Sequence, residues 1–156
     1  MKRSLQSQLK KQQPFEVPQE ELNLNVQRTC SVLIGPFHKL LKQHKLSLPL
    51  YNILRILRGS GCGLPCSEIG DRMVTRESDV TRLLDRLEKL GCVRRERAIE
   101  DRRVVNIVLT PAGKKLVDKL DEPIIELHRE TLGHLSKREM ADLNRLLMKA
   151  RAAIEE

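Results

Sequence analysis

The sequence predicts a mainly α-helical protein that carries one small β-hairpin. Aromatic residues make up only 2% of the 156-residue chain, so leucine, isoleucine and valine must form the core. Such a core favours packed helices over a β-sandwich. Apolar residues also recur at helical spacing through most of the chain. The exception is 93–109, where two alternating runs flank a charged segment, as expected for two antiparallel strands.

The N-terminal third divides into an arm and a helix. Residues 1–18 are polar and rich in glutamine and lysine, which predicts a flexible arm. Residues 19–45 carry apolar side chains at helical spacing, and the Gly35–Pro36 pair is expected to kink or split this helix. The longest apolar run, Cys30–Phe37, is far short of the ~20 residues that a membrane span needs. With no apolar segment after Lys2 and Arg3, we expect a soluble cytoplasmic protein.

Residues 46–110 read as a helix-turn-helix followed by a basic hairpin. A helix is expected to begin near Leu48–Pro49, and a short second helix follows Pro65. Thr75 is expected to cap the third helix, and Gly91 to terminate it. The core-facing stripe of the third helix has i, i+3, i+4, i+7 spacing and comprises Val80, Leu83, Leu84, Leu87 and Leu90.

The hairpin and the C-terminal helices complete the chain. Val93–Arg97 and Val104–Leu109 are predicted strands, and Ala98–Arg103 is the loop between them. Thr110–Pro111 combines a helix cap with proline at the first helical position, and Pro123 is expected to bend or restart that helix. Ser136 to Glu139 fits a capping box that opens a last helix, so 111–156 is predicted to be helical.

The charge pattern points to double-stranded DNA. The net charge is +8, which favours a polyanionic partner. Between Arg72 and Arg103 there are ten basic and seven acidic residues, so their arrangement matters more than their number. The outward face of the third helix would enter the major groove, and the hairpin arginines would reach the minor groove. The candidate DNA-binding residues are Thr75, Arg76, Ser78, Asp79, Thr81, Arg82, Arg86, Arg102 and Arg103, with Asp101 predicted to orient the hairpin arginines.

A plain alternative is a solvated helix face laced by ion pairs, as charged helical faces usually are. The basic hairpin directly after this helix favours the DNA interpretation. A third class, an enzyme, is not supported. The chain has no phosphate-binding glycine loop, HExxH or GxSxG motif, and His128 and His134 lack the i, i+4 spacing of a shared helix face. We therefore expect no catalytic residues, metal site or cofactor.

The four cysteines are Cys30, Cys62, Cys66 and Cys92. A chain of this size does not need a disulfide scaffold, and the CGLPC spacing is not that of a zinc knuckle. A structural role is favoured, and a redox or metal role remains open.

The pattern VTRLLDRLEKLGCVRRERAIEDRRVVNIVLTPAGKKLV, from Val80 to Val117, resembles the MarR family of winged helix-turn-helix transcription regulators. Asp101-Arg102-Arg103 through Leu109-Thr110 fits the family's wing motif, and LSLPLYNILRIL resembles its second helix. The resemblance implies a bacterial, nucleoid-associated repressor that is a homodimer through helices in 19–45 and 111–156. The winged helix-turn-helix of 46–110 would read a pseudo-palindromic operator whose half-sites lie ~34 Å apart.

The resemblance also implies release from DNA by a small-molecule or redox signal. In family members an effector cleft lies beside the winged domain, where His38, His44, Tyr51 and Arg55 would fall. Packing or surface roles are the favoured interpretation for these four residues, so the effector-binding residues are unassigned. Peroxide-sensing members place a cysteine near the start of the first helix, and Cys30 lies further along. The alternative function is a winged-helix module that binds protein or RNA.

Overall fold

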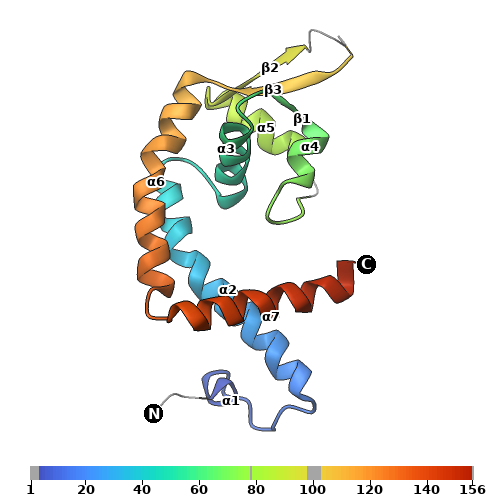
Figure 1. Cartoon of the computed structure of the whole chain (residues 1–156), viewed down its shortest axis with the longest axis vertical. Helices are drawn as coiled ribbons and strands as arrows, with labels where there is room; N and C mark the ends of the chain where they lie inside the picture. Colours follow the sequence, from blue (N-terminus) through green and yellow to red (C-terminus); the bar gives the residue numbers. More distant parts are fainter. Residues whose placement is uncertain (1–3, 78, 98–102, 156) are drawn as a thin grey trace. The chain divides into compact units, whose positions relative to one another are not determined.

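The computed structural model describes residues 4–77, 79–97 and 103–155, in two compact units, Met1–Leu48 and Pro49–Glu156 (Figure 1). Helices dominate both the first unit and the second, and the second also holds a small antiparallel sheet. The predicted fold class is therefore confirmed. Within the described residues, every helix is too short or too polar to cross a lipid bilayer.

The first unit contains a short helix, α1 (Leu5–Gln8), and a long helix, α2 (Pro18–Gln43). Arg28 Nε of α2 donates a hydrogen bond to Gln8 Oε1 at 3.1 Å, which links the two helices. Residues 5–8 are thus helical within the segment 1–18, whose flexibility stays a prediction.

Gly35–Pro36 was predicted to kink or split this helix. A split is wrong, because α2 runs through both residues as one helix, and a kink stays a prediction. Proline removes one amide donor, whereas the backbone bonds of the adjacent turns remain available to hold the helix. Both residues are exposed.

The second unit has its helices and strands in the order predicted from the sequence. It also has one strand, β1 (Leu64–Pro65), that was not predicted. Its elements are α3 (Leu48–Ser60), β1 (Leu64–Pro65), α4 (Cys66–Asp71), α5 (Val80–Lys89), β2 (Val93–Arg97), β3 (Val105–Leu109), α6 (Pro111–Leu132) and α7 (Lys137–Glu155). We call Val93–Leu109 the wing. The strand bounds agree with the predicted hairpin to within one residue.

The sheet has the strand order β1-β3-β2, with Val93 opposite Leu109 and Arg97 opposite Val105. Strand β1 was not predicted, because two residues, one of them proline, are too few to show alternation. Its Leu64 pairs with Ile107. The buried side chains of this unit come from every layer and include Leu50, Ile53, Leu54, Leu57, Ile69, Leu84, Leu87, Val93, Ile107, Val117, Leu120 and Ile124.

The start of α6 is fixed to the base of the wing. The amide of Thr110 donates to the carbonyl of Cys92 at 3.0 Å, and the Thr110 hydroxyl donates to the carbonyl of Gly91 at 2.7 Å. A Cβ at Gly113 would lie 2.1 Å from the same Cys92 carbonyl oxygen, so this contact requires glycine. Gly91 itself has φ +70°, as expected for the glycine that terminates α5.

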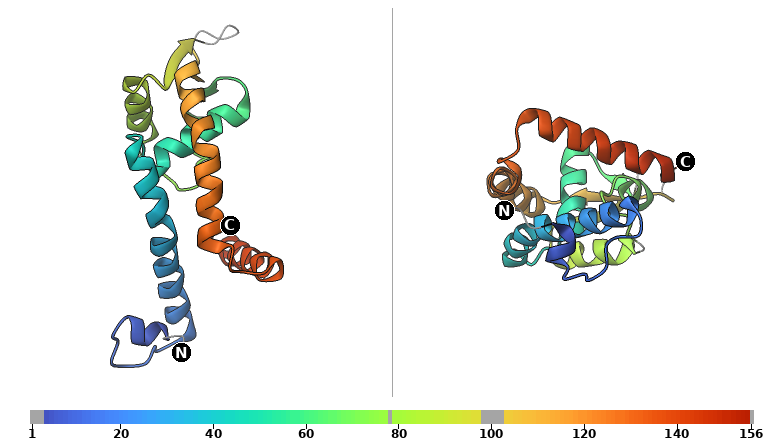
Figure 2. Two further views of the ribbon diagram at one scale, coloured as in Figure 1. Left: turned by 90° about the vertical axis from the view of Figure 1, so that its left-hand side faces the viewer. Right: turned by 90° about the horizontal axis from the view of Figure 1, so that it is seen from below.

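The two C-terminal helices begin as predicted. The Thr110 hydroxyl accepts from the amide of Gly113 at 3.0 Å, and Pro123 lies inside a continuous α6 rather than restarting it. The capping box is present, since Ser136 N donates to Glu139 Oε2 at 2.8 Å and Glu139 N donates to Ser136 Oγ at 3.3 Å. Figure 2 shows α6 running from the base of the wing to α7.

Candidate nucleic-acid interface

The helix-turn-helix consists of α4, the segment that follows it and α5, and α4 contacts α5 directly. The turn is attached to α3, because the amide of Val74 donates to Asn52 Oδ1 at 2.8 Å. Thr81, in the first turn of α5, lies beside α4. The distance between Thr81 Oγ1 and Cys66 Sγ is 3.9 Å. Asn52 of α3 therefore holds the segment before α5, and Cys66 of α4 contacts the first turn of α5.

Thr75 does not cap α5, contrary to the prediction. The helix begins at Val80, and its cap is Asp79, whose Oδ1 accepts from the amide of Arg82 at 2.9 Å. Thr75 lies in the preceding turn and donates from its hydroxyl to Glu77 Oε1 at 3.1 Å. Aspartate is as good an N-cap as threonine, and the apolar stripe starts directly after Asp79. One carboxylate oxygen of Asp79 therefore has a structural role.

The two faces of α5 are separated as the sequence predicted. Leu84 and Leu87 are buried, while Thr81, Arg82 and Arg86 are exposed. Leu90, at the end of the predicted stripe, is 36% exposed and is the C-cap residue. The turn residues Thr75 and Arg76 are exposed as well. Ser78 lies outside the described residues. Contact of these side chains with DNA stays a prediction.

Two acidic side chains of α5 are engaged by the wing. Arg95 of β2 forms hydrogen-bonded ion pairs with Asp85, at 2.6 Å, and with Glu88. The hydrogen bond to Asp85 is the main reason that the pKa of Arg95 is raised. Arg95 therefore balances acidic charge on α5 and fixes the wing to this helix. These two ion pairs were not predicted from the sequence, because nothing in a helical pattern indicates which strand residue will face the helix.

The wing presents a row of exposed polar side chains along β2, from Arg94 to Arg97. Arg94 Nε donates to Glu96 on the same strand. Arg103 is exposed in the turn before β3. Asp101 was predicted to orient a wing arginine, and Arg102 was predicted to lie at the wing tip. Both residues lie outside the described residues.

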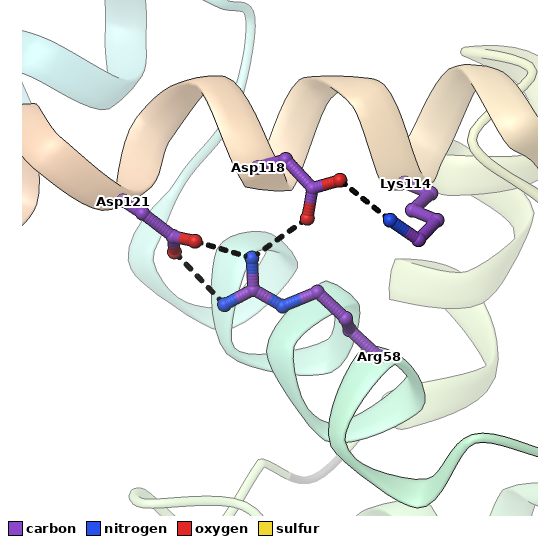
Figure 3. Close-up of polar contacts among 4 residues, drawn as sticks. All are labelled: Arg58, Lys114, Asp118 and Asp121. Atoms are coloured by element: carbon purple, nitrogen blue, oxygen red, sulfur yellow. Dashed lines mark hydrogen bonds and ion pairs between the residues drawn. The ribbon is translucent and has the colours of Figure 1, made fainter.

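A second cluster of ion pairs joins α3 to α6 (Figure 3). Arg58 Nη1 lies 2.9 Å from Asp118 Oδ1 and 2.7 Å from Asp121 Oδ2, and its Nη2 lies 2.8 Å from Asp121 Oδ1. Lys114 Nζ lies 2.8 Å from Asp118 Oδ2. The bond to Arg58 lowers the pKa of Asp121, and the bonds to Lys114 and then Arg58 lower the pKa of Asp118. None of these contacts was predicted, because the partners of Arg58 are distant in sequence. Asp118 lies 60 residues and Asp121 lies 63 residues after Arg58.

A hollow of about 440 Å³ lies between the end of α3, the wing and the start of α6. Its charged lining residues, Arg58, Arg94 and Lys114, are all cationic. Each of them is also paired with a carboxylate outside the lining, namely Asp118, Asp121 or Glu96. The hollow is thus close to electroneutral, and its geometry alone does not demand an anionic ligand.

The residues considered for an effector cleft differ in exposure. Tyr51 is buried, and burial is the main cause of its raised pKa, whereas Arg55 is exposed. His38 is exposed and His44 is half-buried in the first unit. These observations leave the effector-binding residues unassigned.

All four cysteines are free thiols. Cys92 is buried, which raises the pKa of its thiol and fits a packing role. Cys30 and Cys62 are exposed, and Cys66 is half-buried. Among the described residues, no three histidine, cysteine or acidic side chains are clustered as metal ligands.

Comparison with known proteins identifies the same region of the chain. The model of the MarR family matches residues 46–105. The chain is 36% identical over 111 residues to the HTH-type transcriptional regulator PecS of Dickeya dadantii, a match that covers 70% of this chain and 67% of PecS. The matches to the next two curated relatives span 43% and 48% of their lengths.

Solved structures extend the similarity to most of the chain. A MarR transcription factor from Planctomyces limnophilus is 38% identical, with a TM-score of 0.65 over 86% of this chain and 98% of that one. A mutant of MarR from E. coli, in complex with operator DNA, is 24% identical, with a TM-score of 0.74 over 83% of this chain and 92% of that one. The latter match supports the fold. All of the relatives named here are transcriptional regulators or transcription factors rather than enzymes.

Proposed function

The chain belongs to the MarR family of transcriptional regulators, and from this premise we propose that it is a homodimeric repressor that binds a pseudo-palindromic operator in double-stranded DNA. The observation that carries the proposal is the two-sided character of α5. Leu84 and Leu87 are buried in the unit, and Thr81, Arg82 and Arg86 are exposed beside a basic wing. A helix held in this way is suited to the major groove.

Each side chain of this face has a role that follows from its chemistry. Arg82, in the first turn of α5, would donate two hydrogen bonds to a guanine, and Thr81 would contact a base or a phosphate. Ser78 would act in the same way as Thr81. The carboxylate oxygen of Asp79 that does not cap the helix would accept from a cytosine amino group. Thr75, Arg76 and Arg86 flank this centre and would contact phosphates, which position the protein without reading the sequence.

The wing would supply the second contact. Arg102 and Arg103 would enter the minor groove next to the major groove occupied by α5, with Asp101 orienting one of them. The Arg95 link to Asp85 and Glu88 supports this assignment, because it holds the wing against α5. A fixed distance between the two reading elements is what a site spanning both grooves requires.

Dimerisation is supported by apolar surface on both terminal helical regions. On α7, Leu146 is 53% exposed and Met148 is 63% exposed, and on α2, Leu22 is 62% exposed. Rows of exposed apolar side chains on long helices are typical of an interface with another copy of the chain. The operator would then be bound by two copies related by a two-fold axis.

Release by a small-molecule or redox signal is part of the proposal, with the effector unidentified. The protein would act on the nucleoid in the bacterial cytoplasm, and DNA binding would need no cofactor.

The experiment is a selection of bound duplexes from a random-sequence pool at two salt concentrations. The proposal predicts one enriched motif with two-fold symmetry, and an affinity that falls steeply as salt rises. Equal binding of random duplexes at both salt concentrations would count against a specific operator. Preferential binding of single-stranded RNA would support the alternative of an RNA-binding winged helix.

A further inference from the structure

Two polar stripes face each other between α3 and α6. Tyr51, Arg55 and Arg58 are spaced i, i+4, i+7 on α3, so they lie on one face of that helix. Lys114, Asp118 and Asp121 have the same spacing on α6. Besides the bonds from Arg58, the charges of both Arg55 and Arg58 lower the pKa of Asp121. The two helices are joined by a charged seam formed by Arg58, Lys114, Asp118 and Asp121, in which Arg58 makes every bond between the helices (Figure 3).

Arg58 makes the directional contacts of this seam. Its guanidinium binds both oxygens of Asp121 and one oxygen of Asp118, so its orientation is fixed in the plane of the fork. It lies in the last turn of α3, where a cation is favoured by the helix dipole. The Arg58 side chain is 26% exposed, so these contacts are partly shielded from solvent.

The seam is the second of two fixed points on α6. The first is the Thr110 cap at the base of the wing, held to Gly91 and Cys92. Asp121 lies eleven residues further along the helix, which corresponds to about 16 Å. A rod held at one point can pivot, whereas a rod held at two separated points has a defined direction. Val117, Leu120 and Ile124 of α6 are also buried, but apolar contact is not directional and tolerates small sliding movements.

The direction of α6 matters because this helix leads from the wing to α7, whose exposed apolar side chains are proposed to contact the second copy. The 22 residues of α6 span about 33 Å. A tilt of about 10° would therefore move its far end by roughly 6 Å, which is nearly two base-pair steps of DNA.

We propose that Arg58 is a positioning residue that, through Asp118 and Asp121, sets the direction of α6 relative to the winged domain and thereby the half-site spacing that the dimer accepts. This inference rests on the proposed dimeric, DNA-binding function. It assigns to Arg58 an effect on operator architecture, with no contact to a base.

The test uses duplexes selected by the full-length wild-type protein, followed by derivatives in which the half-sites are moved apart or together by about one and about two base pairs. Affinity for each duplex, and for a single half-site, is measured by fluorescence anisotropy. Light scattering reports the dimer. The variants are R58M, R58K and the double variant D118N/D121N. The matched control is K119M, which removes an exposed lysine from α6.

Wild-type protein and K119M are expected to lose about tenfold in affinity when the spacing changes by one base pair, because a dimer of fixed geometry fits one half-site spacing. R58M is expected to bind all spacings within about threefold of one another, with its dimer mass and half-site affinity unchanged. R58K should behave like R58M, because lysine keeps the charge but lacks the fork. D118N/D121N removes the two negative charges that Arg58 binds without changing α3, so it decides the question if R58M does not fold.

The inference would be overturned if an R58M or D118N/D121N dimer showed the same dependence of affinity on half-site spacing as the wild-type protein. This holds even if the variant binds every duplex more weakly. This outcome leaves the proposed function intact, because the wild-type protein would still select an operator. Failure of the wild-type protein to select any duplex would overturn both proposals.

Discussion

Helices α5 and α7 belong to the same unit and are both amphipathic, yet their apolar sides differ in burial. In α5, Leu84 is 1% exposed and Leu87 is fully buried. In α7, none of the described side chains is buried, and Leu146 is 53% exposed. The apolar side of α5 is thus covered within its own chain, and its polar side is the face proposed to contact DNA. The apolar side of α7 is exposed in this chain, and we propose that a second copy covers it.

Helical periodicity identifies which side chains share a face of a helix. It does not say whether the residues that cover an apolar face belong to the same chain or to another copy. Four experiments test the difference between the two helices and the contacts around them.

Removal of residues 136–156, which contain α7, should have the largest effect. We expect a monomer by light scattering, because the apolar surface of α7 is lost together with the helix. Affinity for the selected full operator should fall by roughly 10²–10⁴, since the two half-sites would no longer be bound by one linked molecule. Circular dichroism should show that the remaining helices persist. A stable dimer after the deletion would contradict the interface assigned to α7.

Leucine truncation provides a matched pair across the two helices. Leu84→Ala should lower the free energy of unfolding by about 2–5 kcal/mol, because it leaves a cavity in the core. Leu146→Ala should have little effect on a monomer, and any loss should depend on protein concentration. Urea unfolding at two protein concentrations measures both. Equal, concentration-independent losses for the two variants would remove the distinction between the helices.

Substitution of the exposed arginine of α5 comes next. Arg82→Ala should weaken binding to the selected operator by about 1–3 kcal/mol and relax the preference at one base pair. Arg103→Ala should weaken binding through the wing, with a smaller salt dependence and the major-groove preference retained. Gel-shift titrations against the operator and its single-base variants measure these effects. The assigned DNA-binding face is wrong if neither variant differs from the wild-type protein.

The smallest expected effect concerns acid stability at the α3–α6 seam. The hydrogen bond from Arg58 lowers the pKa of Asp121 below its ordinary value of 3.8. A lowered folded-state pKa stabilises the fold above the unfolded-state pKa, and the contribution is lost as the pH falls through the folded-state pKa. Asp121→Asn should therefore cost about 0.5–1 kcal/mol at neutral pH, a value discounted because the Asp121 side chain is 43% exposed.

The difference between wild-type protein and Asp121→Asn should shrink below pH 3.8, where Asp121 becomes protonated in the unfolded chain and then in the folded one. Urea unfolding between about pH 7 and about pH 3 tests this expectation. Glu122→Gln is the control, because the neighbouring Glu122 side chain is 82% exposed. A constant difference across this range would exclude a contribution from the ionised carboxylate.

Local signals in the sequence were sufficient for much of this fold. The Thr110–Pro111 start of α6, the capping box of Ser136 and Glu139, and the strands of the wing were all predicted, because each depends on residues close in sequence. The predicted cap at Thr75 failed for a related reason. Several residues before α5 are suitable caps, and only the folded backbone selects Asp79.

The contacts that organise the candidate site could not be predicted in the same way. Arg95 with Asp85, and Arg58 with Asp121, join elements whose relative positions follow from tertiary packing. In the sequence these arginines look like any other members of a basic segment. The structure separates arginines that brace the winged domain from Arg82, whose exposed position on α5 makes it a candidate for base contact.

Site-specific photo-crosslinking tests the central claim most directly. A benzoylphenylalanine at position 81, on the exposed side of α5, and another at position 146, on the exposed side of α7, would each report its nearest neighbour in the presence of the selected duplex. We expect position 81 to crosslink to DNA and position 146 to a second copy of the chain. Crosslinking of position 81 to protein alone, with DNA bound, would show that the exposed side of α5 does not face the duplex.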